Sequence, residues 1–153
     1  MDNLDALESE SIYIIREAYR KYGKLAMLWS VGKDSTVLLW LVKKAFFGKV
    51  PIPVIHIDTG LKFPEMYEFR DWCIEKWNLN LIVASNAEKA DELGIKPSDK
   101  LKCCDLRKTQ ALKDSIRKHG FDALLLGIRR DEHGVRAKER VFSPRNKDFQ
   151  WDY

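Results

Sequence analysis

A polar turn early in the chain carries residue types that bind phosphate. It follows the apolar run 25–29 and reads Ser30-Val31-Gly32-Lys33-Asp34-Ser35. A turn between a buried strand and a helix presents backbone N–H groups and the positive end of the helix dipole to an anion. Gly32 permits close approach of the backbone, and the hydroxyls of Ser30 and Ser35 can hydrogen-bond to phosphate oxygens. Lys33 supplies a charge that could follow a leaving pyrophosphate. The turn is therefore a candidate phosphate loop.

Asp34 is the residue of this turn that cannot attract phosphate directly, so it is a candidate for holding Mg²⁺ or for fixing the loop. The same residues are compatible with an ordinary helix N-terminus, where Ser and Asp side chains cap backbone N–H groups. The turn is not a Walker loop, which needs Gly, four residues and then Gly-Lys-Ser/Thr. Its single glycine also excludes the dinucleotide turn Gly-x-Gly-x-x-Gly.

A second polar turn follows the apolar run 54–57. Asp58, Thr59 and Gly60 come directly after this run, so we expect them to project from the carboxyl end of a strand beside the first turn. The carboxylate of Asp58 could bind Mg²⁺ or a ribose hydroxyl. Asp-Thr-Gly after a strand is also an ordinary turn, and that alternative stays open.

A third polar segment begins at Gly127, after the apolar run 123–126. It contains Arg129 and Arg130, followed by further charged residues. The planar guanidinium group of arginine matches the oxygens of sulfate and phosphate, so both arginines are candidates for orienting an oxyanion. The alternative is a solvated, charged surface.

Apolar runs alternate with helical periodicity along the chain. Strands are predicted at 25–29, 54–57, 79–83 and 123–126, and helices at about 12–22, from about 35 to before Gly48, from Pro64, and at about 105–118. Segment 84–102 is mostly polar and its structure is undecided. We expect four residues of the Pro64 helix to face inward: Met66, Phe69, Cys73 and Trp77. We expect the tryptophans to lie in the core.

Strands that alternate with helices predict an α/β fold, a three-layer parallel sheet with helices on both faces. Ligands of such sheets bind outside the carboxyl ends of the strands. The three polar segments all follow predicted strands. The fold class thus predicts that they meet at one edge.

The composition indicates one domain, residues 1–153, in which 128–153 is a charged tail of the active site. The 27 basic residues stand against 23 acidic ones, a balance that suits a small anionic ligand better than a nucleic-acid track. Three cysteines, two of them adjacent, do not form the disulfide framework of a secreted domain. No run of eighteen apolar residues indicates a membrane span. We expect a cytoplasmic protein that binds neither nucleic acid nor membrane.

The first turn resembles the PP-loop of ATP pyrophosphatases, commonly Ser-Gly-Gly-x-Asp-Ser, with Val31 in place of the first glycine. Segments 27–41 and 56–71 resemble the small, catalytic subunits of bacterial two-subunit ATP sulfurylases (sulfate adenylyltransferases). The tail carries the Arg-Arg-Asp-Glu and Arg-Ala-Lys-Glu-Arg of those subunits, at 129–132 and 136–140. The chain is also similar to the wider family that includes phosphoadenylylsulfate and adenylylsulfate reductases. The resemblance covers most of the chain and is weakest over 84–108.

This resemblance implies a PP-loop fold and adenylyl transfer, in which ATP and sulfate give adenylylsulfate and pyrophosphate in sulfate assimilation. It implies that loop 30–35 holds the β and γ phosphates and that Asp34 and Asp58 support Mg²⁺. Arg129 and Arg130 would orient sulfate, and adenine would lie over the strand ends near Leu28, Trp29 and Ile57. Because adenylylsulfate formation is strongly uphill, the resemblance also implies a GTP-hydrolysing partner subunit.

The sequence departs from this pattern at 103–108, which reads Cys-Cys-Asp-Leu-Arg-Lys and is more similar to the reductase branch. A four-iron cluster needs four thiolates, and the chain has only Cys73, Cys103 and Cys104, so we expect idle or buried thiols. The chain also ends where members of the family continue. Two alternatives therefore remain: a sulfonucleotide reductase-like protein, and a nucleotide-binding module without turnover.

Overall fold

A four-stranded parallel sheet forms the centre of the computed structural model, which describes residues 3–152. The strands are β1 (Leu25–Leu28), β2 (Val54–Ile57), β3 (Leu81–Ala84) and β4 (Ala123–Leu125). Their order is β3-β2-β1-β4, and every neighbouring pair is parallel. The short apolar runs therefore predicted the strands and their direction, with boundaries shifted by one or two residues.

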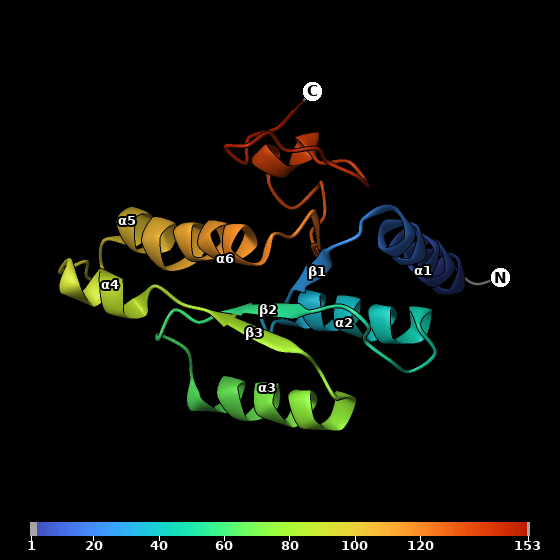
Figure 1. Cartoon of the computed structure of the whole chain (residues 1–153), viewed down its shortest axis with the longest axis horizontal. Helices are drawn as coiled ribbons and strands as arrows, with labels where there is room; N and C mark the ends of the chain where they lie inside the picture. The colour runs from blue at the N-terminus through green and yellow to red at the C-terminus, as the bar shows by residue number, and fades with distance from the viewer. Residues whose placement is uncertain (1–2, 153) are drawn as a thin grey trace.

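Helices connect and flank the strands. They are α1 (Asn3–Lys21), α2 (Lys33–Ala45), α3 (Pro64–Trp77), α4 (Ala87–Glu92), α5 (Lys100–Cys104), the π-helix η1 (Asp105–Gln110), α6 (Ala111–His119) and the 3₁₀ helix η2 (Gly134–Lys138). Figure 1 shows α3 on one side of β2 and β3, and α5 and α6 on the other. No helix within residues 3–152 has the length and apolar character that a membrane crossing requires.

The side chains of β1 alternate between the two faces of the sheet. Leu25 and Met27 join a core with residues of α1, α2 and α3, whereas Ala26 joins a smaller cluster that includes Phe121, just after α6. Such alternation follows from the two-residue period of a strand. The expected three-layer α/β architecture, with helices on both faces, is confirmed.

The aromatic residues of α2 and α3 differ from the expectation. Trp29 is fully buried, but Trp40 is 44% exposed, Trp72 is 53% exposed, and Phe69 is exposed as well. Their rings cover one another instead: Trp72 stacks on Phe69 with centroids 6.1 Å apart, and Trp40 and Trp72 both contact Trp77. The expectation of core positions was therefore wrong for Trp40, Trp72 and Phe69, but Trp29 and Cys73 are buried as expected and Trp77 packs against the core. The buried stripe of α3 centres on Cys73 and leaves Phe69 and Trp72 at its margin.

The segment 100–119 is nearly continuous helix, longer than the predicted 105–118. Its middle is the π-helix η1, between α5 and α6. A π-helical turn contains an additional residue, which rotates the following side chains relative to an α-helix. Within η1, Arg107 is only 3% exposed. Apolar periodicity did not predict an inward-facing arginine.

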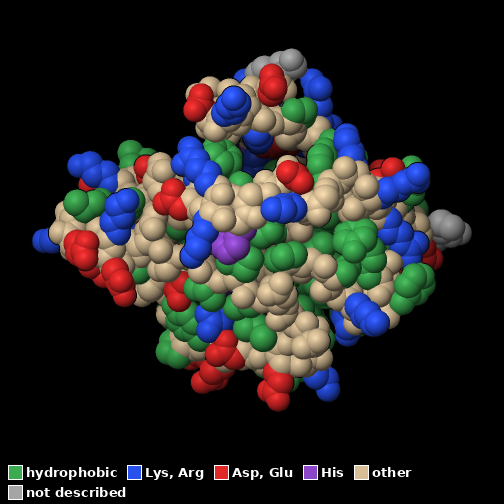
Figure 2. All heavy atoms as spheres, in the orientation of Figure 1, with side chains coloured by type: hydrophobic (Ala, Val, Ile, Leu, Met, Phe, Trp, Pro, Cys, Tyr) green, Lys and Arg blue, Asp and Glu red, His purple; other side chains and the backbone are tan. Residues whose placement is uncertain are grey.

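The C-terminal segment follows η2 with a short hairpin, and Phe149 in it lies against Lys113 and Arg117 of α6. Figure 1 shows this segment in red, above α6 and α1. Arg145 and Trp151 form an isolated antiparallel bridge, and the Arg145 guanidinium lies 4.1 Å from the Trp151 ring centroid. Phe142 contacts Tyr22. On the face that Figure 2 shows, basic and acidic side chains are interspersed rather than gathered into a continuous basic track.

Candidate nucleotide site

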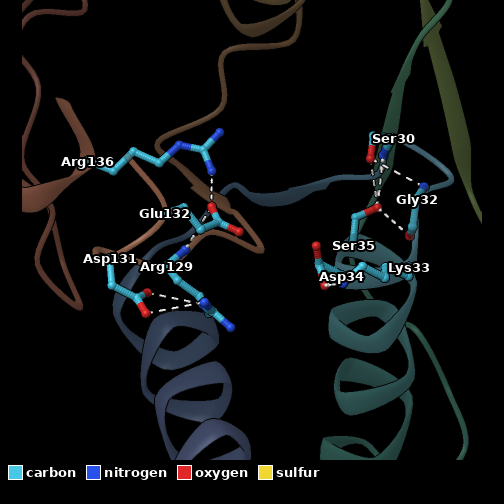
Figure 3. Close-up of polar contacts among 9 residues, drawn as sticks. All are labelled: Ser30, Gly32, Lys33, Asp34, Ser35, Arg129, Asp131, Glu132 and Arg136. Atoms are coloured by element: carbon cyan, nitrogen blue, oxygen red, sulfur yellow. Dashed lines mark hydrogen bonds and ion pairs between the residues drawn. The ribbon is translucent and has the colours of Figure 1, made fainter. Parts of the chain in front are cut away.

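The loop between β1 and α2 is held by hydrogen bonds among its own residues (Figure 3). The hydroxyl oxygens of Ser30 and Ser35 lie 2.9 Å apart, and the Ser35 hydroxyl donates to the Gly32 carbonyl at 3.1 Å. The Ser30 backbone N–H donates to the Ser35 hydroxyl at 3.2 Å. Gly32 is the N-cap of α2 and no side chain caps this helix, so its first N–H groups lie open to an anion. The serines thus shape the loop and do not cap the helix.

Val31 has a backbone φ of 65°. This left-handed conformation favours glycine and is uncommon for a β-branched residue, because Cβ crowds the backbone. Val31 stands at the position where the PP-loop pattern has its first glycine. The loop therefore has a glycine-type conformation at a position that valine occupies.

Lys33 and Asp34 extend from the first turn of α2 into solvent. Their side chains are 3.4 Å apart, between Lys33 Nζ and Asp34 Oδ1, and the Lys33 side chain is 90% exposed. An exposed pair of this kind contributes little stability, so both groups are free to move toward a ligand. Figure 3 shows them beside the loop that Ser30 and Ser35 close.

Asp58 is held rigidly after β2. Its Oδ1 accepts hydrogen bonds from the Gly60 backbone N–H at 2.9 Å and from the Tyr67 hydroxyl at 2.7 Å. Burial alone would raise the pKa of Asp58, but these two bonds and the nearby His56 and Lys62 outweigh it and hold the pKa below the ordinary value. Asp58 is therefore an ionised, oriented carboxylate at the strand end.

His56 and Lys62 belong to the same region; the sequence left open whether His56 lines the site or only packs, and it gave no role to Lys62. His56 is 1% exposed, with Nδ1 3.1 Å from the Trp29 carbonyl oxygen and Nε2 3.2 Å from Lys62 Nζ. Burial, and next the positive charge of Lys62, lower the pKa of His56. Burial is also the largest cause that lowers the pKa of Lys62.

Arg107 fixes the backbone of the second turn. Its Nη1 donates to the Thr59 carbonyl oxygen at 2.9 Å, and its Nη2 pairs with Asp91 of α4. Thr59 is buried, and Gly60 has a φ of 70°. The arginine thus ties together the second turn, α4 and η1, three segments that are distant in the sequence.

The segment after β4 begins against the phosphate loop. A Cβ atom on Gly127 would lie 3.2 Å from the carbonyl oxygen of Asp34, so these two backbones are in close contact. Arg129, two residues later, pairs with Asp131 through Nε at 3.1 Å and Nη2 at 3.2 Å (Figure 3). Arg130 is exposed and makes no hydrogen bond or ion pair within residues 3–152.

The described residues do not form a metal-binding cluster of their own. Among positions 3–152, no group of three or more His, Cys, Asp and Glu residues could hold a metal ion. Cys73 and Cys103 are buried, Cys104 is exposed, and all three are free thiols. The chemistry of the separate carboxylates Asp34 and Asp58 still fits Mg²⁺, which is commonly bound by one or two carboxylates together with substrate phosphates.

A parallel sheet whose strand ends carry a glycine-type loop, an oriented aspartate and a segment with two arginines is typical of α/β nucleotide-binding folds. Residues 24–150 match the phosphoadenosine phosphosulfate reductase domain family. The chain belongs to this family.

Relatives of known name match this chain along nearly its whole length. The chain is 50% identical to sulfate adenylyltransferase subunit 2 of Zymomonas mobilis and 48% identical to that of Aliivibrio fischeri, in each case over 99% of this chain and 51% of the relative. The chain therefore spans about half the length of these relatives.

Solved structures share the fold at low sequence identity. Phosphoadenylyl-sulfate reductase from Candida auris matches with a TM-score of 0.65 and 20% identity, over 84% of this chain and 68% of that one. FMN adenylyltransferase from Candida glabrata, in complex with ATP, matches with a TM-score of 0.68 and 17% identity, over 98% of this chain and 50% of that one. The PP-loop type of fold is thereby confirmed.

Proposed function

We propose that this chain carries the nucleotide site of a sulfate adenylyltransferase, which transfers the adenylyl group of ATP to sulfate. The observation that carries the proposal is the near 50% identity to sulfate adenylyltransferase subunits across the whole chain, all three polar segments included. The geometry agrees with this activity, since an open helix N-terminus, an ionised aspartate and arginines surround one edge of the sheet.

The reaction requires alignment and charge stabilisation rather than covalent help from the protein. A sulfate oxygen attacks the α phosphorus of ATP, the bond from that phosphorus to the bridging oxygen breaks, and pyrophosphate leaves. In this proposal the N–H groups of loop 30–35 and the ammonium of Lys33 bind the β and γ phosphates. The free guanidinium of Arg130 takes the sulfate, and Arg129 assists after exchanging its partner Asp131.

Asp58 and Asp34 would support a Mg²⁺ ion that is bound chiefly by the nucleotide phosphates. Asp58 suits this role because it is ionised and fixed in orientation. Thr59, Gly60 and Gly127 would contribute backbone surface to the nucleotide. The ion would neutralise phosphate charge and lower the repulsion between ATP and sulfate.

The wider setting of the reaction is also a proposal. Adenylylsulfate formation is strongly uphill, so we expect a GTP-hydrolysing partner subunit and a cytoplasmic location. We propose that 1–153 acts as one nucleotide-binding domain in which 128–153 is the active-site tail. In support, Gly127 contacts the phosphate loop directly before this tail begins.

Exchange of labelled pyrophosphate into ATP tests the activity, because the exchange requires reversal of adenylyl transfer. We expect exchange that depends on sulfate and is lost in Arg130→Ala. The measurement is made with the chain alone and with the first subunit of a bacterial sulfate adenylyltransferase added. Exchange that proceeds equally without sulfate, or none under both conditions, would contradict adenylyl transfer to sulfate by this chain.

A sulfonucleotide reductase-like function is the second candidate. The sequence 103–108 and the family to which the chain belongs favour it. Release of sulfite from adenylylsulfate or phosphoadenylylsulfate in the presence of thioredoxin would support this candidate. ATP binding without exchange or sulfite release would instead indicate a nucleotide-binding module without turnover.

A further inference from the structure

We propose that Lys62 binds the α-phosphate group of the nucleotide, and that His56 is the residue that positions it. This inference rests on the proposed nucleotide site. It adds a ligand-binding cation on the second turn, separate from Lys33 on the phosphate loop, and it divides the recognition of ATP between two lysines.

The hydrogen bonds of His56 fix the direction of Lys62. The Trp29 carbonyl oxygen, 3.1 Å from Nδ1, can only accept, so Nδ1 of His56 carries the proton. In the neutral ring, Nε2 is then an acceptor, and it accepts from the Lys62 ammonium at 3.2 Å. His56 is buried and belongs to β2, so its ring, and with it the Nε2 acceptor, is fixed in position. Lys62 is therefore anchored by an oriented acceptor, unlike a flexible surface lysine.

An ammonium group carries three N–H donors, and His56 takes one of them. The electrostatic neighbours of Lys62 are the carboxylate of Asp58 and the cations Arg70 and Lys108. Arg70 is paired with Asp71 at 2.8 Å, and Asp58 already accepts hydrogen bonds from Gly60 and Tyr67. The cations Lys62, Arg70 and Lys108 outnumber the carboxylates Asp58 and Asp71 by one, so the remaining donors of Lys62 lie in a region with a small excess of positive charge, which favours an anion.

The position of Lys62 selects the α-phosphate over the terminal phosphates. Trp29, whose carbonyl oxygen holds His56, directly precedes Ser30 of the phosphate loop. Lys62 therefore lies at the junction between the ends of β1 and β2, whereas Lys33 lies at the start of α2. A nucleotide whose terminal phosphates occupy loop 30–35 passes its α-phosphate over this junction. The two lysines would then contact different parts of ATP.

Calorimetric titration of AMP, pyrophosphate and ATP separates the two lysines. The variants are Lys62→Met, His56→Leu and Lys33→Ala, with Lys76→Met as a control that removes an exposed lysine of α3. Thermal melting of each variant shows that it is folded. We expect Lys62→Met to lower the affinity for AMP and for ATP by about tenfold, because one charged hydrogen bond is lost. The affinity for pyrophosphate should not change.

His56→Leu should give the same ligand pattern as Lys62→Met, since it frees Lys62 without removing its charge. A destabilised site would instead weaken all three ligands alike. Lys33→Ala should weaken the binding of pyrophosphate and of ATP but leave the binding of AMP unchanged. If Lys62→Met binds AMP as tightly as the unaltered chain does, while Lys33→Ala still weakens ATP binding, this inference is overturned. The proposed function would then still stand. Failure of the unaltered chain to bind any of the three ligands would overturn both.

Discussion

Gly127 lies against the backbone of Asp34. A Cβ atom on Gly127 would be 3.2 Å from the Asp34 carbonyl oxygen and 3.5 Å from Cα of Ser35, at the start of α2. The contact joins the end of β4 to the phosphate loop, so the third polar segment can influence the first. The absence of a side chain at Gly127 is what permits this approach.

Gly127→Ala tests the contact. The added methyl group meets backbone atoms, which cannot rotate away, so we expect the loop to shift and the free energy of unfolding to fall by about 1–3 kcal/mol. ATP affinity should fall as well, measured by calorimetry. Gly134→Ala is the matched control, because a Cβ there meets nothing within 4 Å. Equal effects of the two substitutions would contradict the role of the contact.

Val31 provides a second test, through its positive φ. In this conformation Gly is favoured over Ala by about 1 kcal/mol, because a Cβ atom crowds the backbone. Val31→Gly should therefore unfold at a higher urea concentration than Val31→Ala, although glycine normally destabilises a chain. If Val31→Ala is the more stable of the two, the loop does not have the glycine-type conformation.

Arg107 should be sensitive even to a conservative change. Arg107→Lys keeps the charge but cannot reach both the Thr59 carbonyl oxygen and Asp91 with the planar fork of arginine. Leaving the buried carbonyl of Thr59 unpaired should lower the free energy of unfolding by about 1–3 kcal/mol. Arg117→Lys, on the exposed face of α6, is the control. If Arg107→Lys unfolds at the same urea concentration as the unaltered chain, the contacts of Arg107 with Thr59 and Asp91 do not contribute to the stability of the fold.

Tyr67→Phe should change the acid stability of the fold. Because the pKa of Asp58 is held below its ordinary value of 3.8, this carboxylate stabilises the folded state above that pH, and the contribution is lost as the pH falls through the lower, folded-state pKa. Removing the Tyr67 hydroxyl should reduce this contribution by about 1 kcal/mol at neutral pH, since the group is partly solvated. The difference from the unaltered chain should vanish at low pH. A difference that is constant from pH 7 to pH 2 would contradict this assignment.

The parallel sheet could be predicted from the sequence because each strand is a short, continuous apolar run followed by a polar turn. This pattern placed β1, β2 and β4 to within a residue, and it placed Asp58 directly after β2 and Gly127 two residues after the end of β4. Parallel strands with helical connections then require all these turns to lie at one edge. The roles of the individual side chains at that edge remain proposals.

Features that depend on side-chain packing could not be predicted. Periodicity gives no reason for a π-helix at 105–110, and so Arg107 was not identified as buried. The exposure of Trp40 and Trp72 depends on how α2 and α3 are positioned, which hydrophobicity alone does not determine. Likewise, the bond between His56 and Lys62 requires the exact path of the second turn.

Calorimetric titration of the chain with ATP in the presence of Mg²⁺, repeated on Lys33→Ala, tests the central claim most directly. The account predicts Mg²⁺-dependent binding of ATP that is weakened about tenfold or more in Lys33→Ala, because a charged contact to the terminal phosphates is lost. Absence of ATP binding, or binding that Lys33→Ala leaves unchanged, would contradict the assignment of residues 30–35 as the phosphate loop.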